Sequence, residues 1–316
     1  MIDNGYTLFT LDKKSKLDSI QQRGVTAVLA LSATIAVLTT LGILFSIIFQ
    51  AIEFFRLQSL WYFLTGTDWY MSHEGGKFGA VPIFAGTFMI TLIALLLAIP
   101  VGLGNAIYLS EYASRPARNI LKPVLEILAG VPTVVYGFFA ALTVAPAIVE
   151  LSGQLGLDAA YNSALASGLV MGIMITPVIS SLTDDVLTAV PVSQRNAAYA
   201  LGMTRSEVVR HIVVPSAMPG IISASVLGFS KAIGETMIVV MAAGLRPNLS
   251  WNPLEDMTTV TVRIVDALVG DHEFTSPHTL SAFALGLVLF VITLLLNMLS
   301  VSQIRKFRAR YRINKL

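Results

Sequence analysis

The sequence contains no cysteine among its 316 residues, so disulfides, thiolate metal ligands and thiol redox chemistry are excluded. Charged residues are scarce as well, at 13% of the chain against about 25% in an average soluble domain. A Walker A motif is missing, since Gly75-Gly76-Lys77-Phe78 lacks both the spacing and the hydroxyl residue that cradle nucleotide phosphates. The four histidines show no metal-ligand spacing, and there is no Ser/His/Asp constellation. We therefore expect a chain with no enzyme activity, no cofactor and no metal.

Long apolar runs dominate the sequence instead. Hydrophobic residues make up 55% of the chain, and the mean hydropathy is +0.74. Several runs approach or exceed the roughly 20 residues that cross a bilayer, and the first is too long for a signal-peptide core. The runs cover residues 25–49, 81–109, 121–149, 163–182, 219–245 and 279–301. The sequence thus predicts an all-α integral membrane protein with six transmembrane helices.

Lysine and arginine are distributed unevenly between the loops. Most of the 21 basic residues fall in the N-terminal segment, the second-to-third loop, the loop at 184–218 and the C-terminal tail. The positive-inside rule therefore places both termini and that loop in the cytoplasm. We expect residues 1–24 to form a cytoplasmic segment, 25–301 one transmembrane domain, and 302–316 a basic tail lying on anionic membrane lipid. The net charge of +2 then reflects topology, and no nucleic-acid partner is expected.

The loop at 184–218 is polar, contains Gly and Pro at intervals, and is typical of two short helices. Gly202 can take the left-handed conformation that closes the first helix. Thr204 and Glu207 have the spacing of a capping box that opens the second helix. Pro215 is expected to end that second helix, because proline cannot continue one. A helix–Gly–helix between two membrane spans indicates a docking element.

The two short helices have different expected faces. An apolar stripe should pack the second helix against the bundle, and it consists of Val208, Val209 and Ile212. A small, shallow surface suited to a groove on another protein is expected from Ala197, Ala198, Ala200 and Leu201.

The order of residues in this loop resembles the EAA loop of ABC-importer permeases. The matching positions are Asn196, Ala197, Ala198, Gly202, Ile212 and Pro215. Asn196 stands where the family has its first Glu, and Val214 where it has Leu. The resemblance implies a type I ABC-importer permease fold with cytoplasmic coupling helices, and ATP hydrolysis by a separate chain that docks on these residues. An ordinary amphipathic cytoplasmic loop is the alternative.

An aromatic segment precedes the second apolar run. Residues 61–70 read Trp-Tyr-Phe-Leu-Thr-Gly-Thr-Asp-Trp-Tyr, and residues 78–87 read Phe-Gly-Ala-Val-Pro-Ile-Phe-Ala-Gly-Thr. From composition alone these rings fit an aromatic belt at the outer headgroup level. Their order also resembles the phosphate-importer permeases of the PstC type, and further matches lie at 109–113, 126–137 and 231–237.

This second resemblance implies a set of partners. They are a PstA-type permease forming a heterodimer, two PstB-type ATPase subunits and a PstS-type extracytoplasmic binding protein that delivers phosphate. It also implies a multi-pass protein of the plasma (inner) membrane of a prokaryote. Related oxyanion permeases of the sulfate and molybdate class share the coupling loop, so another anion is an alternative substrate.

Glu126, Lys231 and Glu235 fall inside predicted spans, where a charge costs at least about 2.5–3.5 kcal/mol at the helix centre. Lys231 and Glu235 are four residues apart, so on one helix they share a face and can pair. They are candidates for the anion pathway, although a purely structural pair is an equal alternative. The family usually has Arg at the position of Lys231. Glu126 lies near the cytoplasmic start of its span and is expected to reach the headgroups.

Two other classes of function compete with an ABC permease. A secondary transporter would use Lys231 and Glu235 as a proton relay and would need no ATPase. A membrane scaffold or sensor would leave the intramembrane charges unexplained. Co-purification with an ATPase separates the permease from both.

Overall fold

A computed structural model describes the backbone of residues 5–70, 76–270 and 275–312, and the side chains of 22–70, 76–269 and 275–302. The basic side chains expected before residue 22 and after residue 302 lie outside these ranges. Within them the regular secondary structure is helical apart from one short hairpin. Six stretches are long and apolar enough to cross a membrane: Gln22–Leu57, Val81–Tyr112, Thr133–Gln154, Ala164–Thr188, Arg205–Ile233 and Pro277–Ser302. The predicted all-α class with six transmembrane helices is confirmed.

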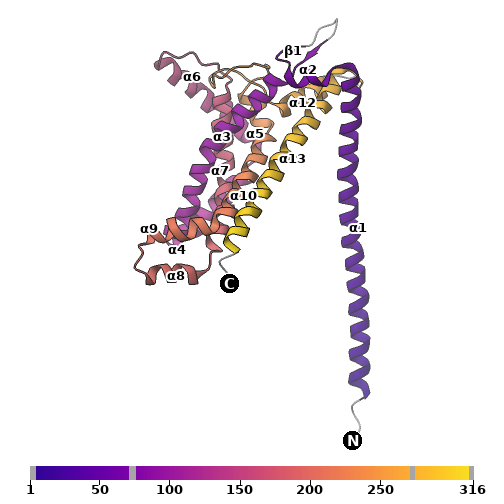
Figure 1. Cartoon of the computed structure of the whole chain (residues 1–316), viewed down its shortest axis with the longest axis vertical. Coiled ribbons are helices and arrows are strands. Elements are labelled where there is room, and N and C mark those ends of the chain that lie inside the picture. The colour runs from indigo at the N-terminus through magenta and orange to yellow at the C-terminus, as the bar shows by residue number, and fades with distance from the viewer. Residues whose placement is uncertain (1–4, 71–75, 271–274, 313–316) are drawn as a thin grey trace.

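The first helix, α1 (Gly5–Leu57), stands apart from the bundle over most of its length (Figure 1). Its side chains from 22 to 43 are all exposed. Contact begins near the end of the helix, where Phe54 is fully buried and α1 lies against α13 (Pro277–Arg312). The helix therefore extends beyond the apolar run that we predicted to stop at residue 49.

The aromatic segment forms a small core at one end of the bundle. It comprises α2 (Leu60–Thr65) and a hairpin of β1 (Trp69–Tyr70) and β2 (Lys77–Phe78), in which Trp69 is opposite Phe78. The Trp69 and Phe78 rings meet edge-to-face with centroids 5.3 Å apart, and both are buried. The Trp69 and Phe78 rings therefore pack on each other and do not form a lipid-facing belt, whereas Trp61 and Tyr70 are 76% and 49% exposed. We call this side of the molecule the hairpin end.

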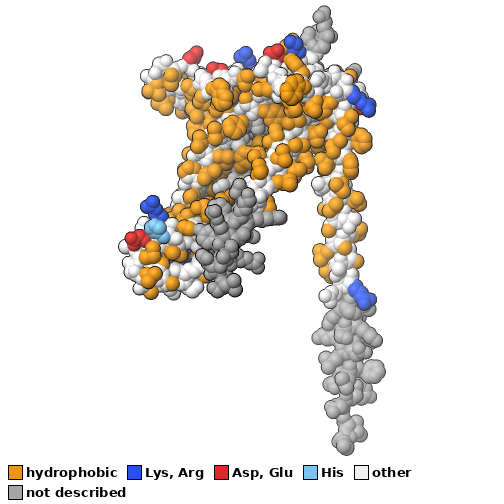
Figure 2. Space-filling model, in the orientation of Figure 1, with side chains coloured by type: hydrophobic (Ala, Val, Ile, Leu, Met, Phe, Trp, Pro, Cys, Tyr) orange, Lys and Arg blue, Asp and Glu red, His pale blue; other side chains and the backbone are white. Residues whose placement is uncertain are grey.

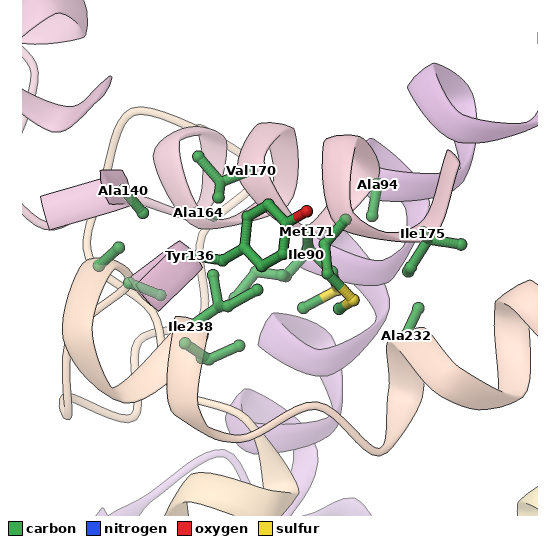
Figure 3. Packing of buried hydrophobic residues seen from close by; sticks show 14 of the residues in the cluster. Ile90, Ala94, Tyr136, Ala140, Ala164, Val170, Met171, Ile175, Ala232 and Ile238 are labelled. Atoms are coloured by element: carbon green, nitrogen blue, oxygen red, sulfur yellow. The ribbon is translucent and has the colours of Figure 1, made fainter. Parts of the chain in front are cut away.

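The main core lies between α3 (Val81–Ile107) and α7 (Ala164–Thr188). Small residues allow the close approach of these helices, because a Cβ atom at Gly172 would lie 2.9 Å from the carbonyl oxygen of Ala94. Around this contact, Tyr136 and Met171 extend into a cluster of aliphatic side chains (Figure 3). The two helices thus form one closely packed element that spans the bundle.

The third predicted span, 121–149, is wrong in its bounds. Inside the predicted range, the helix α4 (Arg115–Ala129) ends and the chain turns before α5 (Thr133–Phe139) begins. Pro132 is the N-cap residue of α5 with ψ 136°, an extended conformation that interrupts the helix. The spanning stretch continues through the π-helical η2 (Ala140–Val144) and α6 (Ala145–Gln154).

α4 is an amphipathic helix with no buried residue, and it lies outside the six spans. Glu126, expected inside a span, is an exposed residue of α4.

The fifth predicted span, 219–245, is also two helices. α10 (Val214–Ile233) ends before Gly234, and α11 (Met237–Ala242) begins after Thr236. A long connection then leads to α12 (Val260–Gly270) and back to α13. The span is therefore broken close to the two charges that the sequence places in it.

Charged side chains gather at the two ends of the bundle, while hydrophobic side chains cover the middle (Figure 2). α4, α8 and α9 lie at the end opposite the hairpin (Figure 1). We call residues 191–215 the coupling loop, after the loop that they resemble, and this side of the molecule the coupling-loop end.

Candidate functional site

The coupling loop contains the two short helices expected from its sequence. α8 (Val192–Ala200) is followed by Gly202, whose φ of +80° is the left-handed conformation that favours glycine. α9 (Arg205–Val208) opens with a complete capping box. The Thr204 amide donates to Glu207 Oε2 at 2.7 Å, and the Glu207 amide donates to Thr204 Oγ1 at 3.4 Å. The predicted turn and cap are confirmed.

The prediction that Pro215 ends the second helix is wrong. After α9 the chain passes through a π-helical segment, η3 (Val209–Val213), directly into α10, so one helical stretch runs from Arg205 to Ile233. Pro215 has no N–H to donate to the turn before it, and the helical stretch passes that turn in the wider π-helical form of η3.

A groove of about 420 Å³ lies between α8 with the turn after it and the segment from η3 to the start of α10. Four of the six EAA-loop positions line it, namely Ala197, Ala198, Ile212 and Pro215. Leu201, next to these positions, lines it as well. Ala198 is only 3% exposed and packs into the apolar cluster beneath the loop, where it forms part of the groove floor.

The remaining EAA-loop positions serve in other ways. Asn196 is exposed and does not line the groove, and Gly202 shapes the turn. The expected packing stripe points inward: Val208 and Val209 are buried, and Ile212 is partly buried against the same cluster.

An ion pair that the sequence analysis missed attaches α8 to the end of α3. Arg195 Nη1 contacts the Glu111 carboxylate, and Arg195 Nη2 donates to the carbonyl oxygen of Leu187 at 2.7 Å. Glu111 belongs to the π-helical segment η1 (Tyr108–Tyr112) that continues α3. Next to it, the guanidinium carbon of Arg205 lies 5.1 Å from the centroid of the Tyr112 ring.

A second charged cluster attaches α4 to the end of α7. Asp184 has no exposed surface and accepts from Arg118 Nη2 at 2.9 Å and from Lys122 Nζ at 3.0 Å. Lys122 also donates to Asp185 Oδ1 at 2.8 Å. The hydrogen bond with Asp185 is the main cause of a raised pKa of Lys122. The stabilisation by this hydrogen bond is therefore fully present below pH 10.5, the ordinary pKa of lysine, and is lost only as the pH rises through the higher pKa of Lys122 in the folded protein.

The break in the fifth span separates Lys231 from Glu235. Lys231 is half-buried in the last turn of α10, and Glu235 follows the end of that helix. The Glu235 carboxylate accepts from the backbone amides of Thr236 and Met237 at 3.2 and 3.1 Å. In the ranges whose side chains are described, no ion pair joins Lys231 to Glu235 or to another acid. The predicted i,i+4 pairing is wrong, because the helix that it needs ends at Ile233.

The backbone around Glu235 is anchored to the hairpin end. Thr261 Oγ1 donates to the carbonyl oxygen of Glu235 at 2.8 Å. The adjacent Val260 amide donates to Thr87 Oγ1 on α3 at 3.0 Å. The broken span is thus linked by two hydrogen bonds through α12 to the first turns of α3.

Comparison with known proteins assigns the architecture to a family. The model of the family described as "Binding-protein-dependent transport system inner membrane component" matches residues 98–312. The chain belongs to this family. Its fold is that of a type I ABC-importer permease, and it is a transport subunit of the inner membrane whose ATPase is a separate chain.

Relatives cover most of the chain. The phosphate transport system permease protein PstC of Mesorhizobium japonicum is 34% identical over 302 residues, covering 88% of this chain and 89% of the relative. The probable ABC transporter permease protein YqgH of Bacillus subtilis is 31% identical over 297 residues, covering 92% of this chain and 93% of the relative. A solved bacterial alginate ABC transporter has a chain with TM-score 0.63 at 15% identity, covering 90% and 94%, which supports the fold alone.

Proposed function

We propose that this permease carries inorganic phosphate, and that Lys231 lines the anion route. The observation that carries the proposal is the lack of an ion-pair partner for Lys231 among the described side chains, although it is half-buried near the end of a membrane-spanning helix. A charge inside a span without a counter-charge is costly. A passing anion supplies that counter-charge.

Glu235 has a separate role in this proposal. Its carboxylate is held by two backbone amides of the helix break, so it holds the local backbone and leaves Lys231 free to meet the anion. Phosphate carries one or two negative charges near neutral pH, and a single lysine provides a point charge without a rigid fork. One cation of this kind lowers the barrier for an anion without trapping it.

The relatives support phosphate as the substrate, since the PstC proteins of Mesorhizobium japonicum and Mycobacterium tuberculosis are named as phosphate permeases and match at 34% and 33% identity. By the same likeness we propose a PstA-type permease as the partner in a heterodimer. Two PstB-type ATPase subunits and a PstS-type binding protein complete the proposed importer.

The groove lined by α8, the turn after it, η3 and the start of α10 is the proposed docking site for the ATPase. It lies at the coupling-loop end, and the helices α1 and α13 begin and end toward that same side (Figure 1). Together with the basic residues of the loops and tail, this arrangement supports a cytoplasmic position for the loop and both termini. The hairpin end then faces the binding protein.

Uptake by the complete transporter in lipid vesicles tests the proposal. With ATP and the binding protein supplied, radiolabelled phosphate should accumulate, and a large excess of unlabelled sulfate or molybdate should not compete. Uptake of sulfate or molybdate in place of phosphate would assign the chain to another oxyanion. Uptake driven by an ion gradient without ATP would contradict ATP-driven transport.

A further inference from the structure

Each short helix of the coupling loop places an arginine against η1, the π-helical end of α3. Arg195 on α8 pairs with Glu111, and Arg205 on α9 lies over the ring of Tyr112. Glu111 and Tyr112 are consecutive residues of η1, the π-helical continuation of α3. The loop is therefore tied at two points to the end of one transmembrane helix. Single π-helical turns of this kind are frequent at functional sites.

The inner contact is well enclosed. The side chain of Glu111 is 5% exposed and that of Arg195 is 17% exposed. Arg195 is held further by the carbonyl oxygen of Leu187 at the end of α7. An enclosed ion pair contributes little net stability compared with apolar side chains of the same volume, so its value lies in fixing geometry. Neither residue of the pair lines the groove, so the contact is separate from the docking surface.

The far end of α3 reaches the broken span. Close packing at Gly102, Gly168 and Gly172 holds α3 against α7 on both sides of its internal Pro100. At the hairpin end, Thr87 of α3 accepts from the amide of Val260, and the neighbouring Thr261 donates to the backbone of Glu235. A displacement of η1 along α3 would thus reach the segment beside Lys231.

We propose that the Glu111–Arg195 and Tyr112–Arg205 contacts transmit movement of the coupling loop to α3 and so to the broken fifth span. Arg195 is a positioning residue: it contacts neither the groove nor Lys231, and it acts through Glu111. This inference rests on the proposed ATP-driven transport. Without the two contacts, the ATPase should still dock and hydrolyse ATP, but hydrolysis should no longer move the anion.

The ratio of anions taken up to ATP hydrolysed, measured in vesicles with the complete transporter, tests the inference. In Arg195→Gln and in Glu111→Gln, the ATPase should co-purify and hydrolyse ATP as before, while the ratio falls about tenfold, a typical size for coupling between sites. Tyr112→Leu should lower the ratio as well, whereas Tyr112→Phe keeps the ring face and should retain it. Arg56→Gln removes the exposed pair with Glu53 and serves as the control.

A charge-swapped variant, Glu111→Lys with Arg195→Glu, should recover part of the ratio that either single change loses. An unchanged ratio in Arg195→Gln and Glu111→Gln would overturn the inference. So would a parallel loss of hydrolysis and uptake, or a loss of assembly that the swapped variant restores, since these identify a structural pair.

An error in the proposed substrate gives a different result from an error in this inference. If phosphate is not the substrate, the unmodified transporter takes up no phosphate, and the ratio is then measured with the oxyanion that it does carry.

Discussion

The Nζ atom of Lys122 lies 3.0 Å from Oδ2 of Asp184, a carboxylate with no exposed surface. Arg118 approaches the same carboxylate at 2.9 Å, so two cations from α4 meet one buried acid at the end of α7. α4 contributes no buried residue of its own. These ion pairs are therefore a principal attachment of α4 to the bundle.

Asp184→Asn should destabilise the protein. The substitution keeps the volume but leaves the two cations without their buried counter-charge. Removing one partner of a fully buried pair costs about 3–5 kcal/mol, and we expect about 2 kcal/mol here because Arg118 and Lys122 are 31% and 29% exposed. Thermal unfolding in mild detergent measures the effect. Asp185→Asn is the control, since Asp185 is 62% exposed and should change the stability by about 0.5 kcal/mol or less.

Gly202→Pro should abolish recruitment of the ATPase while membrane insertion remains normal. Proline fixes φ near −65°, whereas the turn between α8 and α9 has φ +80° at this position. Gly156 also has a positive φ, of +70°, but lies after α6 at a distance from the loop. Gly156→Pro should therefore strain the backbone similarly and leave ATPase co-purification intact. Equal recruitment by both variants would show that this turn does not shape the docking site.

Filling the groove should weaken docking without disturbing the fold. Ala197 is exposed and lines the groove, so Ala197→Trp adds bulk where the ATPase is proposed to bind. Ala200, which the sequence predicted on the same docking surface, is exposed on this helix but does not line the groove, so Ala200→Trp is the matched control. We expect about tenfold weaker ATPase binding for Ala197→Trp alone, a loss of about 1.4 kcal/mol, measured by titration of the ATPase onto the purified permease. Equal weakening in both variants would place the contact elsewhere.

Features set by neighbouring residues could be predicted from the sequence. Gly202 and the Thr204–Glu207 capping box act within a few residues, so their pattern was sufficient to place the turn and the start of α9. The two helix breaks were missed for different reasons: apolar residues continue through Gly130, whereas at the second break Lys231 and Glu235 were interpreted as a pair on one continuous helix. Pro132 was the available signal for the first break, since a residue before proline rarely stays helical.

Contacts between distant residues could not be predicted. Glu111 and Arg195 are 84 positions apart, and nothing in either local pattern indicates that α8 folds back under α3. The Lys231–Glu235 pairing failed for the opposite reason. Its spacing predicts a pair only on a continuous helix, and the chain leaves the helix between the two residues.

The central claim is that Lys231 lowers the barrier for an anion in an ATP-driven permease. The most direct test compares phosphate uptake by two variants. One is the double variant that combines Lys231→Met and Glu235→Gln and so removes both charges, and the other is Lys231→Arg, which keeps the cation. Both transporters should assemble by gel filtration and bind the ATPase. The account predicts poor phosphate uptake by the uncharged double variant and near-normal uptake by Lys231→Arg. Full uptake by the uncharged double variant in reconstituted vesicles would contradict it.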